Sequence, residues 1–321
     1  MTAAATTTDN SLPMIEIPAP DFDLAMTLGS GQVFHWEPAE RGFVGTIGQL
    51  PVYVEQTGDI LKISDRSQDL ECIMHSSLKR VVSDYFALDH PLAEICASFP
   101  NDAAMKMARD FCRGLRIIRQ PKWECLATFI CSSMKQVAHI RQISKNLRQR
   151  FGESRQIAGR AVHTFPPAER VATSSDKELR ECALGYRAKN LLATARQVAS
   201  GEVDLEKLAT LSDAGLRERL GQLPGVGAKV ANCVMLFAYE RLRAFPIDVW
   251  IERVLREKYF PRARKLNAAR LRAFTQEYFG EHGGYAQQYL FHHARMNRTT
   301  IKIKTKRKRK RDGFVTVSAV K

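Results

Sequence analysis

The spacing of hydrophobic and polar residues changes once along the chain, close to residue 65. Before that point, runs of β-forming residues alternate with turn residues, at 31–36, 42–47, 52–55 and 60–63. The Thr57-Gly58-Asp59 stretch has the turn chemistry of a hairpin between the last two runs. The pattern therefore predicts an N-terminal antiparallel sheet.

After this change the hydrophobic positions follow a helical spacing that continues, with interruptions, almost to Arg298. The stretch Arg119-Gln120-Pro121 interrupts it, and a long helical pattern follows at 123–151. Further along, Ser175 and Glu178 have the spacing of a capping box, which predicts the start of another helix.

These patterns predict an α+β fold class, with an N-terminal antiparallel β-sheet plus helices followed by an all-α domain. Residues 1–12 are rich in Ala and Thr and lack the basic start and apolar stretch of a signal peptide, which indicates a disordered leader. The predicted boundaries are 1–12 for the leader, 13–118 for the α+β domain, 119–300 for the helical domain and 301–321 for a basic tail.

The charge of the chain points to an anionic partner. Its 321 residues, 45% of them hydrophobic, carry a formal net charge of +15. The last 21 residues hold nine Lys and Arg against Asp312, a net +8, so the first 300 residues keep +7. Both parts favour a polyanion. The stretch 304–311 is predicted to be disordered, and to be an arm that adds DNA affinity, a nuclear localisation signal or simply a solvated run of charge.

The cysteines and the hydropathy indicate an intracellular protein. Seven cysteines are scattered without a Cys-x-x-Cys pair, and no secretory signal precedes them, which favours a reduced compartment. That compartment is the nucleus if the source is eukaryotic, and the cytoplasm or nucleoid if it is bacterial. No apolar run approaches the roughly 20 residues that span a bilayer, so no membrane partner is expected.

A helix-hairpin-helix pattern lies at 212–240, where the sequence reads SDAGLRERLGQLPGVGAKVANCVMLFAYE. In the hairpin, Gly225 and Gly227 permit a tight turn around Val226 and leave main-chain N–H groups at a helix N-terminus. A DNA phosphate can bind there without regard to base sequence. The alternative for this short turn alone is a purely structural connection between two helices.

Two residues near the hairpin have the chemistry of a nucleophile and its assistant. Lys229 lies in the first turn of the second helix, where the helix dipole and a desolvated pocket would favour the neutral, nucleophilic amine. Asp248 follows 19 residues later, at the start of the next predicted helix. It could assist proton transfer, or it could be only an N-cap.

The order of hairpin, lysine, Pro-containing loop and aspartate resembles the helix-hairpin-helix/Gly-Pro-Asp superfamily of DNA glycosylases. The resemblance sharpens to the 8-oxoguanine DNA glycosylases, because segments 28–36, 123–133, 184–189 and 286–291 are also similar to that family. It extends from about residue 13 to residue 298. It implies that the chain is a bifunctional DNA N-glycosylase and AP lyase.

The resemblance further implies a pocket for the flipped base. Gly31 would sense the proton on N7 of the oxidised base, Gln287 would meet its Watson–Crick edge, and Phe291 would stack on it opposite Cys233. Each of these residues also has an ordinary interpretation, as a turn glycine or as core.

Recognition of the base opposite the lesion is expected to depart from the family. Tyr186 and Arg187 resemble its wedge residues, but Met134 and His139 stand where the family commonly has Asn and Arg. Met cannot make the hydrogen bonds of an amide, and His offers fewer donors than Arg. Weaker discrimination of the opposite base is expected. Trp250 also replaces a histidine that usually follows the aspartate.

The implied reaction is attack of Lys229 on C1′, with Asp248 assisting, followed by a Schiff base and β-elimination. No cluster of four cysteines follows Asp248, so an iron–sulfur module of the endonuclease III type is not expected. No cofactor is expected, although the resemblance admits a structural monovalent cation at the hairpin. The expected partner is damaged double-stranded DNA, and the expected state is a monomer. The alternatives are an alkylated-purine glycosylase of the same superfamily and a non-catalytic helix-hairpin-helix DNA-binding protein.

Overall fold

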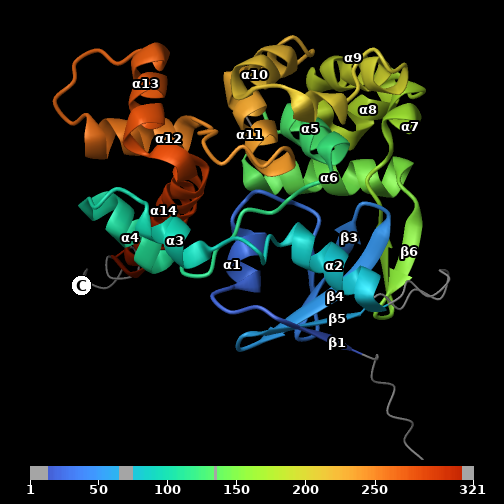
Figure 1. Ribbon diagram of the computed structural model, residues 1–321, viewed down its shortest axis with the longest axis horizontal. Coiled ribbons are helices and arrows are strands. Elements are labelled where there is room, and N and C mark those ends of the chain that lie inside the picture. Colours follow the sequence, from blue (N-terminus) through green and yellow to red (C-terminus); the bar gives the residue numbers. More distant parts are fainter. Residues whose placement is uncertain (1–13, 65–74, 134–135, 313–321) are drawn as a thin grey trace, which may run out of the picture.

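Figure 1 shows the computed structural model, which describes residues 14–64, 75–133 and 136–312. The N-terminal part is a five-stranded antiparallel sheet with the order β1-β5-β4-β3-β2. Its strands are β1 (Ile15–Pro18), β2 (Glu37–Ala39), β3 (Gly42–Ile47), β4 (Leu50–Thr57) and β5 (Ile60–Ser64). The predicted strands at 42–47, 52–55 and 60–63 are confirmed, and so is the hairpin between the last two, in which Thr57 pairs with Ile60.

The predicted strand at 31–36 is wrong. These residues are all described and none of them is in a strand. Val33, Phe34 and Trp36 are all buried instead of alternating between two faces. The main-chain carbonyl of Gln32 accepts a hydrogen bond from the Gln120 side chain at 2.8 Å, where a strand would use a neighbouring strand.

The sheet packs on two helices to form a core of its own. Helices α1 (Leu24–Gly29) and α2 (His75–Tyr85) contribute Leu24 and Leu78 to a cluster that also holds Val54 and Leu61. Burial of this apolar face is what stabilises the sheet. The next helices, α3 (Leu92–Ala97) and α4 (Ala103–Phe111), belong instead to the core of the helical region and lie beside α14 in Figure 1.

The helical region follows. Its helices are α5 (Lys122–Cys131), α6 (Val137–Phe151), α7 (Ala168–Ala172), α8 (Asp176–Leu179), α9 (Arg187–Ala199), α10 (Asp213–Gly221), α11 (Ala228–Ala238), α12 (Val249–Val254), α13 (Ala268–Tyr278) and α14 (Gly283–Asp312). Short π- or 3-10-helical turns lie at Arg180–Leu184, Lys207–Thr210, Leu255–Tyr259 and Gly280–His282. The predicted capping box of Ser175 and Glu178 is present at the start of α8.

Two predictions for this region need correction. The helical pattern at 123–151 is two helices, because α5 ends at Cys131 and α6 begins at Val137. The region is also not all helical, since β6 (Ser154–Ile157) and β7 (Arg160–His163) form a two-stranded hairpin.

A buried ionic cluster joins the two parts of the chain. Arg148 of α6 bonds the carboxylate of Glu124 on α5, and its other terminal nitrogen donates to Thr46 Oγ1 of β3 at 2.9 Å. His35 Nδ1 lies 3.4 Å from the same carboxylate. Burial, with help from Arg148, lowers the pKa of His35 well below its usual value, so this histidine is neutral. The cluster anchors the start of α5 to the sheet.

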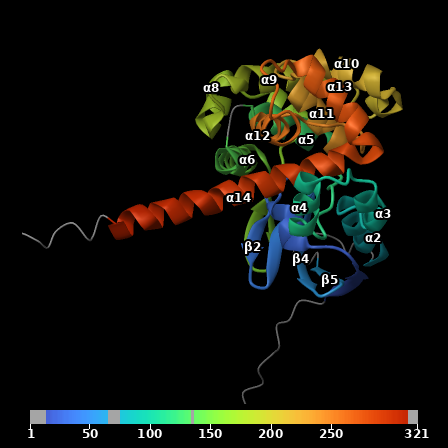
Figure 2. The ribbon, with the colours of Figure 1, turned by 90° about the vertical axis from the view of Figure 1, so that its left-hand side faces the viewer.

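Helix α14 extends beyond the body of the protein, as Figure 2 shows. The sequence predicted disorder at 304–311, but the helix continues through Asp312. The predicted leader at 1–12 lies outside the described residues. Among the described helices, none is both long enough and apolar enough to cross a membrane.

Candidate active site

The hairpin between α10 and α11 has the geometry that its glycines require. Gly225 has φ +82, and a Cβ there would lie 2.8 Å from Cβ of Asn190, so only glycine fits on both counts. Val226 is buried and anchors the turn in the core. Gly227 is the N-cap of α11 and provides no side-chain cap, and it is exposed together with Ala228. The positive end of α11 is therefore open to an anion.

Lys229, in the first turn of α11, is held at the end of α5. Its Nζ donates to Ser132 Oγ at 3.1 Å and lies 5.0 Å from the centroid of the Phe129 ring. The Ser132 hydroxyl in turn donates to the Phe129 carbonyl at 2.8 Å, which orients its lone pairs toward the lysine. Sequence reasoning did not single out Ser132, because nothing in the Cys-Ser-Ser segment shows which side chain will face α11.

Asp248 is the N-cap of α12 and lies within electrostatic reach of Lys229. Its Oδ1 accepts from the main-chain N–H of Trp250 at 3.0 Å and of Ile251 at 2.9 Å. Burial raises the pKa of this carboxyl, while the amide bonds and the charge of Lys229 act in the opposite direction. The prediction that Asp248 is an N-cap is therefore confirmed. Capping also holds a largely desolvated carboxylate where the charge of Lys229 acts on it, as an assisting group requires.

Cys233 lies one turn after Lys229 and completes this side of the site. Its thiol is buried, and burial raises its pKa to about 11 although the charge of Lys229 opposes the shift. The thiol is therefore uncharged at neutral pH and presents a polarizable, apolar wall.

A second group of predicted residues meets around α14. Gly31 has φ +91, and a Cβ there would be 3.2 Å from Cε1 of Phe291. Gln287, one turn before Phe291, is buried, and its Oε1 accepts no hydrogen bond from any residue that the structure describes. A buried amide oxygen without a donor is costly, so it marks a position where a ligand donor would be favourable. The guanine edge presents such a donor at N2.

Aromatic contacts connect the two groups. The Phe34 ring, three residues after Gly31, packs edge-on against Phe129 at 6.3 Å between centroids, and Phe129 is the ring beneath Lys229. At the start of α14, a Cβ at Gly284 would lie only 2.3 Å from the side chain of Leu236 on α11, so the two helices are in close contact.

The residues predicted to read the opposite base do not form a single cluster in the structure. Met134 lies outside the described residues, and His139 is exposed on the first turn of α6. Tyr186 is 57% exposed at the N-terminus of α9, which is unusual for so large an aromatic side chain. Arg187 is buried, stacks on Tyr186 at 4.4 Å and donates from Nε to the Ser133 carbonyl at 2.8 Å. It thus ties the exposed tyrosine to the end of α5.

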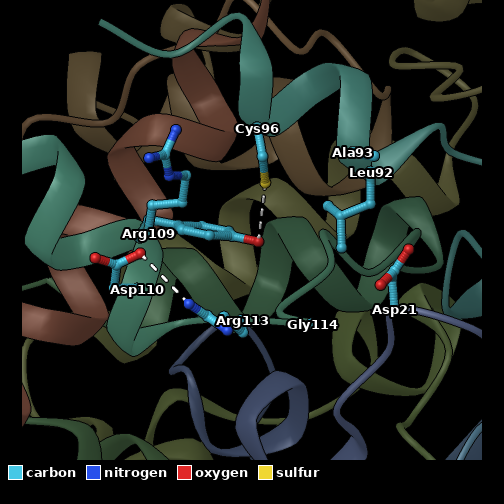
Figure 3. Close-up of a pocket in the computed structure, with 9 residues that line it drawn as sticks. Asp21, Leu92, Ala93, Cys96, Arg109, Asp110, Arg113 and Gly114 are labelled. Atoms are coloured by element: carbon cyan, nitrogen blue, oxygen red, sulfur yellow. Dashed lines mark hydrogen bonds and ion pairs between the residues drawn. The ribbon is translucent and has the colours of Figure 1, made fainter. Parts of the chain in front are cut away.

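A hollow of about 370 Å³ lies on another side of α14, between α3 and α4 (Figure 3). Its lining includes Cys96, Arg109 and Tyr289, and none of the predicted site residues. Tyr289 is two residues from both Gln287 and Phe291, which places it on the opposite face of the helix. The hollow is therefore separate from the candidate site.

Comparison with known proteins shows which family this chain belongs to. The N-terminal domain of 8-oxoguanine DNA glycosylase matches residues 14–126, and the HhH-GPD superfamily of base excision DNA repair proteins matches residues 127–277. The N-glycosylase/DNA lyase OGG1 of Arabidopsis thaliana is 31% identical, over 84% of this chain and 77% of that protein. This chain belongs to the 8-oxoguanine DNA glycosylase family. As in the rest of that family, no cofactor takes part.

Two further relatives match this chain over nearly the whole of their own length. A probable N-glycosylase/DNA lyase of Methanothermobacter thermautotrophicus is 28% identical over 88% of this chain and 96% of its own. The structure of the Clostridium acetobutylicum 8-oxoguanine glycosylase/lyase, in complex with double-stranded DNA containing cytosine opposite 8-oxoG, has a TM-score of 0.80 at 31% identity, covering 89% and 98% of the two chains. Within the described residues of this glycosylase, no three His, Cys, Asp or Glu side chains are grouped to hold a metal.

Proposed function

We propose that this protein excises 8-oxoguanine, and also formamidopyrimidine, from duplex DNA and then cuts the strand by β-elimination. The observation that carries the proposal is that the charge of Lys229, which is held by Ser132, acts on the half-buried, capped carboxylate of Asp248. A second group, formed by Gly31, Gln287 and Phe291, lies around α14. The flipped base would stack on Phe291 and supply the donor that Gln287 Oε1 lacks.

The chemistry follows from the two charged groups. Asp248 stabilises positive charge as it develops on the sugar, and the lysine Nζ forms a bond to C1′ as the bond to the base breaks. The departing base takes up a proton, and loss of the ring oxygen from C1′ leaves a Schiff base with Lys229. Conjugation acidifies a hydrogen on C2′, so a base can remove it and the 3′ phosphate leaves. Water then hydrolyses the Schiff base and frees Lys229.

The DNA would approach the face that carries the α11 N-terminus. The amides around Gly225 and Gly227 would bind a phosphate, and the exposed ring of Tyr186 would act as the wedge. With His139 and Met134 in place of Arg and Asn, we expect modest preference for cytosine opposite the lesion. The protein would act as a monomer, in the nucleus or in the bacterial cytoplasm according to its source.

Substrate class is tested by single-turnover excision from matched duplexes containing 8-oxoguanine, an alkylated purine or an undamaged base. We expect release from the 8-oxoguanine duplex alone, with strand cleavage following. Release from the alkylated duplex alone would favour the alkylated-purine alternative. Binding without any release would favour a non-catalytic DNA-binding protein.

A further inference from the structure

The turn at 29–32 leaves one main-chain carbonyl open. The Gly29 carbonyl accepts from an Arg295 terminal nitrogen at 2.5 Å, and the Ser30 carbonyl accepts from Gln288 Nε2 at 3.1 Å. The Gln32 carbonyl accepts from the side chain of Gln120 at 2.8 Å. The Gly31 carbonyl has no hydrogen bond to any described residue. Three carbonyls of the turn are therefore held by side chains, while the fourth is available to a ligand.

Arg295 touches both the turn and the aromatic wall. One terminal nitrogen lies 3.0 Å from the position that a Cβ on Gly31 would take, and the guanidinium carbon lies 5.5 Å from the centroid of the Phe291 ring. The nitrogen that bonds Gly29 also lies 3.1 Å from His292 Nδ1. A planar guanidinium can make such contacts at once, whereas an ammonium cannot.

Helix α14 thus presents two adjacent rows of side chains, one toward the lesion site and one toward the 29–32 turn. Gln287 and Phe291 are four residues apart and form the row that faces the lesion. Gln288 and Arg295 are seven residues apart, which also places them on one face of a helix, and they hold the turn. The distance between the Gly31 carbonyl and Phe291 is therefore set by a single rigid element.

The charge of Arg295 is retained at a cost. Burial and the neighbouring charge of Arg141 lower its pKa to about 10, so the group is still protonated at neutral pH. An aliphatic side chain would fill the same space without that penalty. One compensating interaction is the hydrogen bond to Gly29, which is charge-assisted and hence stronger than an ordinary one.

We propose that Arg295 is a positioning residue that fixes the Gly31 carbonyl against Phe291 before DNA binds, and thereby sets the discrimination between 8-oxoguanine and guanine. The proposal rests on the proposed function. At N7, 8-oxoguanine carries a hydrogen that can donate to this carbonyl, whereas guanine presents a lone pair that repels it. Both effects depend steeply on distance, so a turn that moves loses selectivity before it loses binding.

The test measures binding to otherwise identical 8-oxoguanine:cytosine and guanine:cytosine duplexes, in a Lys229→Gln background that prevents turnover. Arg295→Lys retains the charge and Arg295→Met removes it. In both variants we expect the preference for the lesion to fall about tenfold, the effect of losing one charge-assisted hydrogen bond. In the Lys variant, affinity for the undamaged duplex should stay unchanged. Arg272→Met, on the exposed face of α13, is the matched control.

Three results would overturn the proposal. One is an unchanged preference in both variants. Another is an equal loss on both duplexes with Arg295→Lys, which would make Arg295 a phosphate contact. The third concerns Gln288→Leu, which frees the Ser30 carbonyl of the same turn and replaces Arg295→Met if that variant does not fold. A preference for the lesion that stays normal in Gln288→Leu would show that α14 does not position the turn. If the Lys229→Gln parent shows no preference for the lesion, the proposed function itself fails.

Discussion

Asp248 is the N-cap of α12, and we propose that it is also the catalytic carboxylate; substitution can separate these two roles. Asp248→Asn keeps a side-chain oxygen for the N–H groups of Trp250 and Ile251, while Asp248→Ala removes it. Loss of an N-cap costs about 1 kcal/mol and at most about 2. We therefore expect the Ala variant to lose roughly that much unfolding free energy relative to the Asn variant.

The pH dependence of the Asn variant follows from the direction of the pKa shift. Burial raises the pKa of Asp248, so the folded protein holds this proton more tightly than the unfolded chain does. The stability that the group contributes is present below the unfolded pKa of about 3.9 and is lost as pH rises through the folded pKa. The amide of Asn does not titrate, so the variant does not lose this stability as the pH rises. The stability of Asp248→Asn relative to the wild type should therefore increase from acidic to neutral pH.

Catalysis should respond differently from stability. Both variants lack the carboxylate, so single-turnover excision should fall by about 10²- to 10⁴-fold in each. Denaturant unfolding at several pH values and excision at neutral pH provide the two measurements. An Asn variant as unstable as the Ala variant would contradict the capping argument, and an Asn variant with wild-type excision would remove Asp248 from the mechanism.

Four further predictions concern other regions. Deletion of 302–321 should flatten the dependence of DNA affinity on log salt but leave single-turnover excision intact, and an unchanged slope would rule out a DNA-binding arm. Arg148→Met should lower the unfolding free energy by about 3–5 kcal/mol in denaturant titration, because it leaves Glu124 buried without its partner. His139→Arg should sharpen the preference for cytosine opposite the lesion, measured as a ratio of excision rates. Gly31→Ala should slow excision without unfolding the protein, because a Cβ would press on Phe291.

The sequence predicted the residues whose positions depend on local structure. The hairpin glycines, Lys229 and Asp248 lie at helix starts, so the order of helices along the chain is enough to locate them. Three strands of the sheet were predicted for a similar reason, because alternation and turn residues are local signals.

The missed features depend on contacts distant in sequence or on unusual turn chemistry. The segment 31–36 is rich in β-forming residues, but side chains from Gln120 and α14 hold its main chain. The β6–β7 hairpin turns through Ala158 and Gly159, both with positive φ, and alanine in that position is not a recognisable turn signal. Arg295 lies 266 residues from Gly29, the residue it bonds, and no spacing rule would pair them.

The central claim is that Lys229 is the nucleophile, and borohydride trapping tests it most directly. The protein is incubated with an 8-oxoguanine:cytosine duplex and borohydride, beside Lys229→Gln and an undamaged duplex as controls. The account predicts a covalent protein–DNA adduct that requires both the lesion and Lys229. An adduct that persists in Lys229→Gln would place the nucleophile elsewhere, and base release without any adduct would contradict the Schiff-base mechanism.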